Sequence, residues 1–392
     1  MARRVDPRAT VRAARCEKRK FRPTVIDIHF ERLRTLGLTP ALANSATHAA
    51  TSADDSIALE LLRLTEVHRD TVRLHDGADE LTARMPPRLT RTLAEAGAML
   101  AVGDWVLAAT DPHGQIWVHV RVPPINHINR RDADGRRHTV VSNVDSALLV
   151  MGLNDDFNPR RLERYLALVH AGGGEGGITP AVVLTKADVI ANVPGLLAQR
   201  IDALRGRVPA AIDLFAIDGT DSYTVRQLQA YLGVGQTLVV LGSSGAGKST
   251  LTNTLLGRAT QDTGAVREHD SRGKHTTTSR SLHRLPGGAC IIDTPGLRAL
   301  RPDVDEATLA AAFGDIESFA MQCRFRDCKH LDEPGCTVRE RVPADRVENY
   351  HKLLREARRD TMSVLERRQQ LAMWKTRGRA GRERMKQKRD DA

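Results

Sequence analysis

The sequence is poor in aromatic side chains and in long apolar runs, and each shortage excludes a class of protein. Only 4% of the 392 residues are aromatic while 41% are hydrophobic, so the cores must be largely aliphatic. No apolar run approaches the roughly 18 residues that cross a bilayer. The N-terminus lacks the apolar segment of a secretory signal, and Asp6 and Glu17 argue against an organelle transit peptide. We therefore expect a cytoplasmic protein of two or three compact domains.

Cysteine is also scarce, and its placement does not suit disulfides. Of the five cysteines, Cys16 lies in a basic arm and Cys290 in an apolar run, where it is expected to be a small core residue. The other three cluster with a histidine, and an odd, clustered set in a chain without a signal favours metal. The spacing C-x4-C-x-H-x5-C suits tetrahedral Zn²⁺ in a closed structural site, whereas unrelated reduced cysteines are the alternative. The predicted zinc ligands are Cys323, Cys328, His330 and Cys336.

Acidic side chains are in the minority, but the positive excess is confined to the two ends of the chain. The formal net charge is +11. Residues 1–22 carry nine Lys or Arg against two acids, and residues 366–392 carry ten against four, which leaves the body between them at −2. Cationic arms attract polyphosphate backbones whatever the sequence. The ends are candidates for contacts with nucleic acid; the alternative is that they are solubilising tails.

The first part of the chain predicts a small all-β domain behind a basic extension. Residues 1–60 combine a basic arm with weakly helical, polar sequence. Residues 61–137 contain short β-like runs separated by Gly and Pro turns, which is typical of a small barrel or sandwich. At this spacing Trp105 and Trp117 are expected in the barrel core, with stacking on bases as the alternative. The β-like runs include 66–74, 104–109 and 115–120.

The remainder predicts an α/β domain over 138–304, a mostly helical zinc-binding domain over 305–373 and a basic tail over 374–392. Short, continuous apolar runs rich in branched side chains are typical of strands buried on both faces of a parallel sheet. The segment GGGEGG at 172–177 is expected to be a flexible connector. The expected strands cover 147–151, 181–184, 237–241 and 290–292; the expected helices cover 159–170, 191–204 and about 344–373.

A glycine-rich loop, GSSGAGKST, follows the run 237–241 and precedes an apolar helical run. Glycines let successive backbone N–H groups wrap an anion, and the following helix adds its positive N-terminal end. We therefore predict a P-loop in which Lys248 contacts the β- and γ-phosphates and Ser249 binds Mg²⁺. ATP-driven transporters and nucleotide kinases share this loop, so it does not choose the nucleotide. The predicted loop residues are Gly242, Ser243, Ser244, Gly245, Ala246, Gly247, Lys248, Ser249, Thr250 and Leu251.

Two further motifs favour guanine. The tetrapeptide Asp293-Thr-Pro-Gly296 follows an expected strand, where the acid can hold Mg²⁺ through water and the glycine N–H can sense the γ-phosphate. The sequence TKAD follows another expected strand and resembles the NKxD element, whose Asp reads the guanine edge and whose Lys stem covers the ring. A Thr stands where Asn is usual. Residues 215–222 are a loose candidate for a second base-contacting loop. The predicted base-binding residues are Thr185, Lys186, Ala187 and Asp188.

The segment GKHTTT at 273–278 lies between the P-loop and DTPG. A threonine at this point would close over Mg²⁺ and the γ-phosphate, so we predict a switch loop with Thr277 as the Mg²⁺ ligand; the alternative is a Ser/Thr-rich connector. Leu297 occupies the position at which many GTPases carry a water-orienting Gln, and leucine cannot polarise water. His275 is the nearest candidate for that role. The predicted catalytic residues are His275, Lys248 and Thr277.

The motifs occur in an unusual order. TKAD precedes the P-loop and DTPG comes last, whereas ordinary GTPases begin with the P-loop. A parallel α/β sheet tolerates such a circular permutation because new termini can be cut at one loop and the old termini joined. The permutation makes the DTPG switch run directly into the C-terminal domain, so the nucleotide state can pull on that domain.

The set TKAD, GSSGAGKST, GKHTTT, DTPGL and C-x4-C-x-H-x5-C, in that order, resembles the ribosome small-subunit-dependent GTPase A family of bacteria over roughly residues 61–370. The resemblance implies an N-terminal OB-fold, a circularly permuted GTPase domain and a C-terminal zinc domain. It also implies GTP/GDP, Mg²⁺ and Zn²⁺ as cofactors and His275 as the catalytic candidate. The implied activity is GTP hydrolysis stimulated by the small ribosomal subunit late in its maturation, with that subunit and its rRNA as partners, no membrane, and a monomeric protein.

Two other functions remain open from the sequence. One is an RNA-binding assembly scaffold in which nucleotide binding is vestigial, which would show no stimulation of hydrolysis by small subunits. The other is an ATP-using kinase or transporter subunit, which is excluded if GDP binds far more tightly than ADP.

Overall fold

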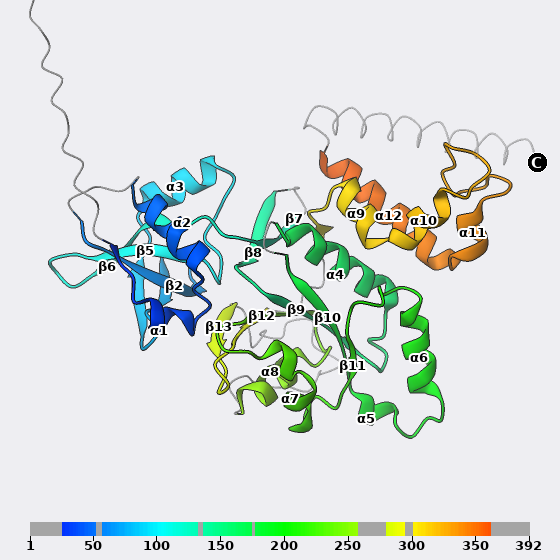
Figure 1. The fold of residues 1–392 in the computed structure, drawn as a ribbon, viewed down its shortest axis with the longest axis horizontal. Helices are drawn as coiled ribbons and strands as arrows, with labels where there is room; N and C mark the ends of the chain where they lie inside the picture. Colours follow the sequence, from blue (N-terminus) through cyan, green and yellow to red (C-terminus); the bar gives the residue numbers. More distant parts are fainter. Residues whose placement is uncertain are drawn as a thin grey trace, which may run out of the picture.

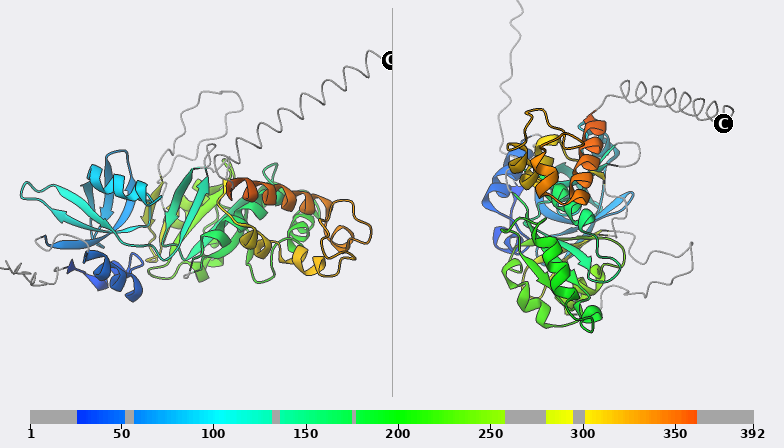
Figure 2. Two further views of the ribbon diagram at one scale, coloured as in Figure 1. Left: turned by 90° about the horizontal axis from the view of Figure 1, so that it is seen from above. Right: turned by 90° about the vertical axis from the view of Figure 1, so that its right-hand side faces the viewer.

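The computed structural model describes residues 26–51, 57–131, 136–174, 177–257, 280–294 and 301–361. A β-barrel lies at one end, an α/β domain follows, and a group of C-terminal helices packs on the other side of that domain (Figure 1). Figure 2, seen from above, shows the barrel and the C-terminal helices at opposite ends. Among the described residues, none of the helices combines the length and the apolarity that a membrane span requires.

A short helical segment precedes the barrel: β1 (Ile26–Asp27), α1 (Phe30–Arg34) and α2 (Pro40–Ala50). The Oγ1 of Thr39 accepts from the backbone N–H of Leu42 at 3.3 Å, and Pro40 stands at the start of α2, where its missing N–H is harmless. The buried side chains of α2 recur every four residues, so they form one face against the barrel core. From the sequence, this part of the extension was predicted only to be weakly helical and polar.

The barrel has five strands: β2 (Leu59–Val67), β3 (Thr71–His75), β4 (Glu80–Arg84), β5 (Trp105–Thr110) and β6 (Ile116–Arg121). They pair in the order β2-β3-β4-β6-β5, and β5 returns to β2, which closes the sheet. Helix α3 (Pro87–Glu95) connects β4 to β5. This closed barrel confirms the OB-like fold expected at the N-terminus.

Two sequence expectations for the barrel need correction or refinement. The run 66–74 is not one strand: β2 ends at Val67 and β3 begins at Thr71, so a tight turn divides it. Trp105 is fully buried in the core, as predicted. Trp117 departs from the prediction, because it is only partly buried. Its indole N–H donates to Asp111 at 3.0 Å, which satisfies the polar end of the ring.

The α/β domain is a six-stranded sheet in the order β11-β10-β9-β12-β14-β13. Alternate residues of β9 face two different hydrophobic cores, which explains its continuous apolar sequence. The four strands predicted from the sequence, β9, β10, β12 and β14, are parallel to one another, as expected. Strand β13, which the sequence did not predict, runs antiparallel to β14 and also pairs with barrel strand β2. The strands are β9 (Ser146–Gly152), β10 (Thr179–Thr185), β11 (Leu214–Ala216), β12 (Thr237–Gly242), β13 (Ser281–Arg284) and β14 (Cys290–Asp293).

Helices cover both faces of this sheet. The predicted helix at 159–170 is α4, which Asn158 caps by accepting from the Arg161 N–H. The predicted helix at 191–204 is wrong in extent, because residues 191–195 form a turn that ends in Gly195 with a positive φ. Cys290 is buried in the core, as expected. The helices are α4 (Pro159–Gly172), α5 (Ala187–Ile190), α6 (Leu196–Arg205), α7 (Tyr223–Gln227), the 3-10 turn η1 (Gln229–Tyr231) and α8 (Lys248–Leu256).

Between barrel and α/β domain lies a separate small sheet of β7 (His127–Arg131), β8 (Arg137–Ser142) and β15 (Arg301–Pro302). The hairpin β7–β8 spans the limit at 137/138 that the sequence placed between the first two domains. These domain limits remain predictions.

Arg63 of β2 ties the barrel to its neighbours. Its side chain is fully buried, and its guanidinium donates to the carbonyl oxygens of Leu36 and Asn143 at 2.9 Å and lies 4.9 Å from the ring centre of Trp105. One arginine thus connects the N-terminal helical segment, the barrel and the start of the α/β domain.

The C-terminal part is helical, with α9 (Glu306–Ala312), α10 (Gly314–Ala320), α11 (Thr337–Arg341) and α12 (Ala344–Thr361) around a core of their own. A buried polar network fastens it to α4. The carboxylate of Glu163 accepts from Arg346 at 2.7 Å, from Asn349 at 2.6 Å and from Arg207 at 3.1 Å. Arg346 also makes a two-pronged contact with Asp315 of α10.

Candidate nucleotide and metal sites

The carboxyl ends of four parallel strands bring the sequence motifs together. Strands β10, β9, β12 and β14 are neighbours in that order, and each is followed by a polar loop. TKAD begins at the last residue of β10, the P-loop begins at the last residue of β12, and Asp293 closes β14. Ligands of open α/β sheets bind at this edge, so motifs separated along the chain converge on one region.

The P-loop has the backbone that its glycines predict. Gly245 and Gly247 have φ values of +80° and +90°, and helix α8 begins within the motif, at Lys248. A Cβ on Gly247 would lie 3.0 Å from the hydroxyl oxygen of Thr185. Glycine is therefore required at this position both by conformation and by the close approach of the neighbouring strand.

Lys248 is almost fully buried, with 6% of its surface exposed. Its Nζ donates to the carbonyl oxygen of Ser243 at 2.7 Å. The pKa of this lysine is lowered, mainly because the side chain is buried, and the nearby carboxylates of Asp293 and Asp156 oppose this shift only in part. Two carboxylates therefore offset part of the cost of burying the ammonium group.

The TKAD motif is joined to the P-loop by its first residue. Thr185 is buried, and its hydroxyl donates to the carbonyl oxygen of Ala246 at 2.6 Å. Lys186 takes the left-handed conformation, with φ of 60°, and Asp188 is exposed in the first turn of α5. The threonine that departs from the usual asparagine therefore supplies a side-chain bond between the two loops.

The loosely assigned stretch 215–222 lies next to both loops. The carbonyl oxygen of Ile217 accepts from the Ala187 N–H at 3.2 Å, and that of Gly219 accepts from the Thr254 hydroxyl at 2.6 Å. This segment thus bridges α5, which follows the TKAD strand, and α8, which follows the P-loop.

Asp293 is buried at the end of β14, and the hydroxyl of Thr294 donates to the Val240 carbonyl oxygen at 2.6 Å, which fixes the first two residues of DTPG against β12. The other predicted switch residues, including Gly296, Leu297, His275 and Thr277, lie outside the described residues.

Asp156 is a residue that the sequence reasoning missed. It follows β9 in the polar run Asn154-Asp155-Asp156, the only signal that could have marked it. One carboxylate oxygen accepts from the Ser243 hydroxyl at 2.7 Å and the other accepts from the Gly152 N–H at 3.1 Å. Arg161 donates to the first of these oxygens at 2.5 Å.

The four predicted zinc ligands are gathered in one place. One ligand atom from each of them lies within 4.8 Å of all the others. The sulfur atoms of Cys323 and Cys336 are 4.0 Å apart, and they lie 3.7 and 3.4 Å from Nδ1 of His330. The edges of a tetrahedron with metal–sulfur bonds of about 2.3 Å are about 3.8 Å long, so the four residues can hold a metal ion.

The local backbone explains how the four predicted metal ligands meet. His330 takes the left-handed conformation, with φ of 58°, and Gly335 does so with φ of 72°. The Arg324 N–H donates to the Gly335 carbonyl oxygen at 3.1 Å, which draws the two ends of the loop together. Burial and the neighbouring thiols raise the pKa of Cys328 to about 11, so a bound cation would be needed to hold its thiolate.

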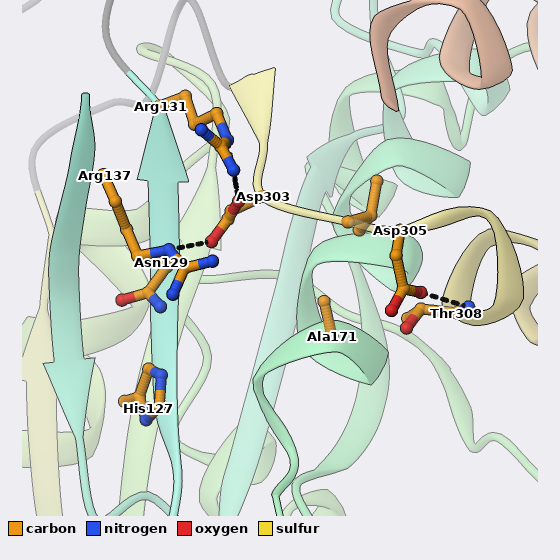
Figure 3. Close-up of a pocket in the computed structure, with 9 residues that line it drawn as sticks. His127, Asn129, Arg131, Arg137, Ala171, Asp303, Asp305 and Thr308 are labelled. Atoms are coloured by element: carbon orange, nitrogen blue, oxygen red, sulfur yellow. Dashed lines mark hydrogen bonds and ion pairs between the residues drawn. The ribbon is translucent and has the colours of Figure 1, made fainter. Parts of the chain in front are cut away.

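A polar hollow of about 280 Å³ lies away from both sites, between the β7–β8 hairpin, the end of α4 and the start of α9. Figure 3 shows Asp303 pointing towards two arginines of the hairpin. Its carboxylate pairs with Arg131 at 2.7 Å and with Arg137 at 2.5 Å. The chain that follows the DTPG motif is therefore clamped to the hairpin where it enters the C-terminal part.

Comparison with known proteins shows which family this chain belongs to. A family model described as RsgA GTPase matches residues 122–302. A curated relative, the small ribosomal subunit biogenesis GTPase RsgA of Xanthomonas oryzae pv. oryzae (strain MAFF 311018), is 44% identical over 299 residues, which cover 74% of this chain and 79% of that protein. The chain belongs to the RsgA GTPase family. As a member of that family it is an enzyme that hydrolyses GTP.

Other comparisons agree with this assignment. The protein of the same name from Xanthomonas campestris pv. campestris (strain B100) is 45% identical over 301 residues. The crystal structure of YjeQ from Thermotoga maritima matches with a TM-score of 0.53 at 20% identity, covering 76% of this chain and 98% of that one. YloQ, described as a circularly permuted GTPase, matches with a TM-score of 0.52 at 20% identity, covering 78% and 97%. The family and the fold inferred from the sequence motifs are confirmed.

Proposed function

We propose that this RsgA-family GTPase acts in the late maturation of the small ribosomal subunit and that the subunit stimulates its hydrolysis of GTP to GDP and phosphate. The curated relatives are named for small-subunit biogenesis, which supports the proposal. The observation that carries it is the convergence of TKAD, the P-loop and Asp293 at adjacent strand ends, in permuted order, within a chain of this family.

In this proposal the guanine base lies against Thr185, Lys186, Ala187 and Asp188, and the phosphates lie along residues 242–251. Asp188 is exposed and free to accept from the base edge, and Lys248 is already held beneath the loop. Mg²⁺ would be bound by Ser249 and Thr277, with Asp293 acting through water and Gly296 near the γ-phosphate. His275 and Thr277 would complete the catalytic group with Lys248.

The four-residue metal site is proposed to bind Zn²⁺ as a structural ion. Three thiol groups and one imidazole make a donor set that this borderline-soft cation prefers. The ligand atoms of all four residues lie within 4.8 Å of one another, and four protein ligands would complete a tetrahedral shell without a reacting water. Zinc would fix the loop between α10 and α11 and would not take part in hydrolysis.

The proposed partners are the small subunit and its rRNA, met by a monomeric protein in the cytoplasm. The basic ends of the sequence and the OB-like barrel supply surfaces suited to a phosphate backbone. Coupling between nucleotide and partner would pass through the segment after DTPG, because Asp303 pairs it to the hairpin and α9 begins three residues later.

The test is the GTPase rate measured alone and with small subunits, large subunits or naked rRNA. We expect the rate to rise steeply with small subunits and little with the other two. An RNA-binding scaffold with vestigial nucleotide binding would show the same low rate in all four conditions, and this result would refute the proposal.

Base selection is tested by Asp188→Asn. The carboxylate accepts hydrogen bonds from the guanine N1–H and amine, and asparagine places a donor towards the amine. We expect GDP to bind more weakly to the variant while xanthosine diphosphate binds more tightly than it does to the parent protein. Unchanged GDP affinity would remove TKAD from the site. Exposed Asp202 on α6 provides the matched control, because it lies outside the TKAD motif and pairs with Arg205 on its own helix.

A further inference from the structure

The loop after β9 lies between the two nucleotide motifs in the sheet, and it carries an acid that none of the GTPase motifs includes. Asp156 sits on the P-loop side of this loop, where its carboxylate is only 14% exposed. It is bonded at both oxygens, by the Ser243 hydroxyl at 2.7 Å and by the Gly152 N–H at 3.1 Å. The carboxylate is therefore fixed by the end of its own strand and is linked by a hydrogen bond to the start of the P-loop.

Ser243 is held from two sides. Its hydroxyl donates to Asp156, and its carbonyl oxygen accepts from Nζ of Lys248 at 2.7 Å. The residue lies between the end of β12 and the start of α8, so neither the sheet ladder nor the helix fixes it. By positioning Ser243, Asp156 therefore also positions the carbonyl oxygen that accepts from the ammonium group of Lys248.

The charges around Asp156 agree with this role. Its negative charge favours the charged form of Lys248 and offsets part of the larger effect of burial, which lowers the pKa of the lysine. Arg161, in the first turn of α4, donates to the same carboxylate oxygen as Ser243 and also to the Asp156 carbonyl oxygen. This pairing offsets the negative charge that would otherwise repel the phosphates, and it orients the carboxylate towards Ser243.

We propose that Asp156 is a positioning residue for the P-loop, which holds Ser243, and through it Lys248, in the arrangement that receives the nucleotide phosphates. The inference rests on the proposed nucleotide site. Because preorganised donors gain affinity by avoiding the cost of ordering, its removal should weaken GDP and GTP alike and leave the choice of base unchanged.

The experiment compares nucleotide affinity in full-length Asp156→Ala, Asp156→Asn, Ser243→Ala and the double variant D156A/S243A. Asp155→Ala is the matched control, because Asp155 is the exposed neighbour in the same polar run. Fluorescent GDP and a non-hydrolysable GTP analogue are titrated to give both the Kd and the number of binding sites per chain. KM and kcat for GTP are measured in parallel.

We expect D156A to raise the Kd of both nucleotides by roughly tenfold or more, since a lost hydrogen bond to a charged group is worth at least this much. D156N should fall between D156A and the parent, because its amide oxygen can still accept from Ser243. The Kd of D156A/S243A should lie within about twofold of the Kd of the weaker-binding single variant, because both substitutions remove the same hydrogen bond. For D156A the rise in KM should exceed the fall in kcat, and the GDP-to-ADP preference should match that of D155A.

Three outcomes would overturn the inference. D156A could bind both nucleotides as tightly as D155A, or the losses of D156A and S243A could multiply in the double variant. Alternatively D156A could show fewer binding sites per chain with an unchanged Kd, which is the signature of partial unfolding. A parent protein that binds no guanine nucleotide would instead refute the proposed function, so the two failures are distinguishable.

Discussion

Glu163 offers the sharpest test of how the C-terminal helices are fastened to the GTPase domain. The residue is 2% exposed on α4, and its carboxylate accepts from Arg346, Arg207 and Asn349. Breaking a buried ion pair by removing one partner destabilises a protein by about 3–5 kcal/mol. Each arginine would keep a second carboxylate, Arg346 with Asp315 and Arg207 with Asp345, so we expect Glu163→Ala to lie near the lower end, at about 3 kcal/mol.

The assay is limited proteolysis under native conditions. A loss of about 3 kcal/mol raises the population of the detached C-terminal part on the order of 100-fold. When opening is fast relative to cleavage, the cleavage rate follows that population. Cleavage within residues 305–361 should therefore accelerate by this factor in E163A, whereas GDP binding should persist. Glu163→Gln should resemble E163A if the charge rather than the packing fastens the helices.

Glu348→Ala is the control. Glu348 also pairs across this interface, with Arg160 at 2.8 Å, but it is 70% exposed. A solvent-exposed pair contributes about 0–1 kcal/mol, so cleavage should accelerate by less than about fivefold. Equal acceleration in E163A and E348A would refute the argument that the buried network holds the two parts together.

Three further predictions follow from the sites and the same interface. Thr185→Ala should weaken GDP binding by roughly five- to thirtyfold, because it removes the bond to Ala246, while Thr185→Ser should keep it; equal affinities would show that the bond does not matter. Chelation of the metal, or Cys328→Ala, should unfold the 321–336 loop, seen by hydrogen exchange, and leave GDP binding intact; fresh protein without zinc would end this idea. Burial alone would raise the pKa of Asp345, but Arg207 and Arg160 lower it. At pH values above the ordinary carboxyl pKa, charged Asp345 should therefore help to hold the C-terminal helices on the GTPase domain, and this stabilisation should be lost as the pH falls through the lowered pKa of the folded protein. Asp345→Asn should remove this pH-dependent change in the rate of proteolysis.

The sequence by itself determined those features whose chemistry is carried by one short segment. The P-loop is specified locally, because glycines at positive φ and a lysine at the start of a helix create the loop wherever the chain places it. The predicted metal site is specified in the same way, since the four residues that could hold the ion lie within one loop. Strands β9 and β12 were readable because burial on both faces leaves a continuous apolar run.

Other features depended on tertiary structure, because their partners are distant in the chain. The sequence of β13 does not reveal that it runs antiparallel and joins the barrel, since pairing is decided by the neighbouring strands. The length of the run 66–74 concealed a turn for a similar reason: two adjacent strands with a short turn carry the same β-forming side chains as one. The predictions for His275 and Thr277 lie outside the described residues and stay predictions.

The polar contacts that position the sites were the least visible from the sequence. Asp156 and Ser243 are 87 residues apart, and Glu163 and Arg346 are 183 apart. An acid or an arginine in a polar stretch is most often a solvated side chain, and only the packing of α4 and the strand ends removes these four from water. Once buried, each requires a partner, so the fold rather than the local sequence selected the pairs that hold the P-loop and the C-terminal helices in place.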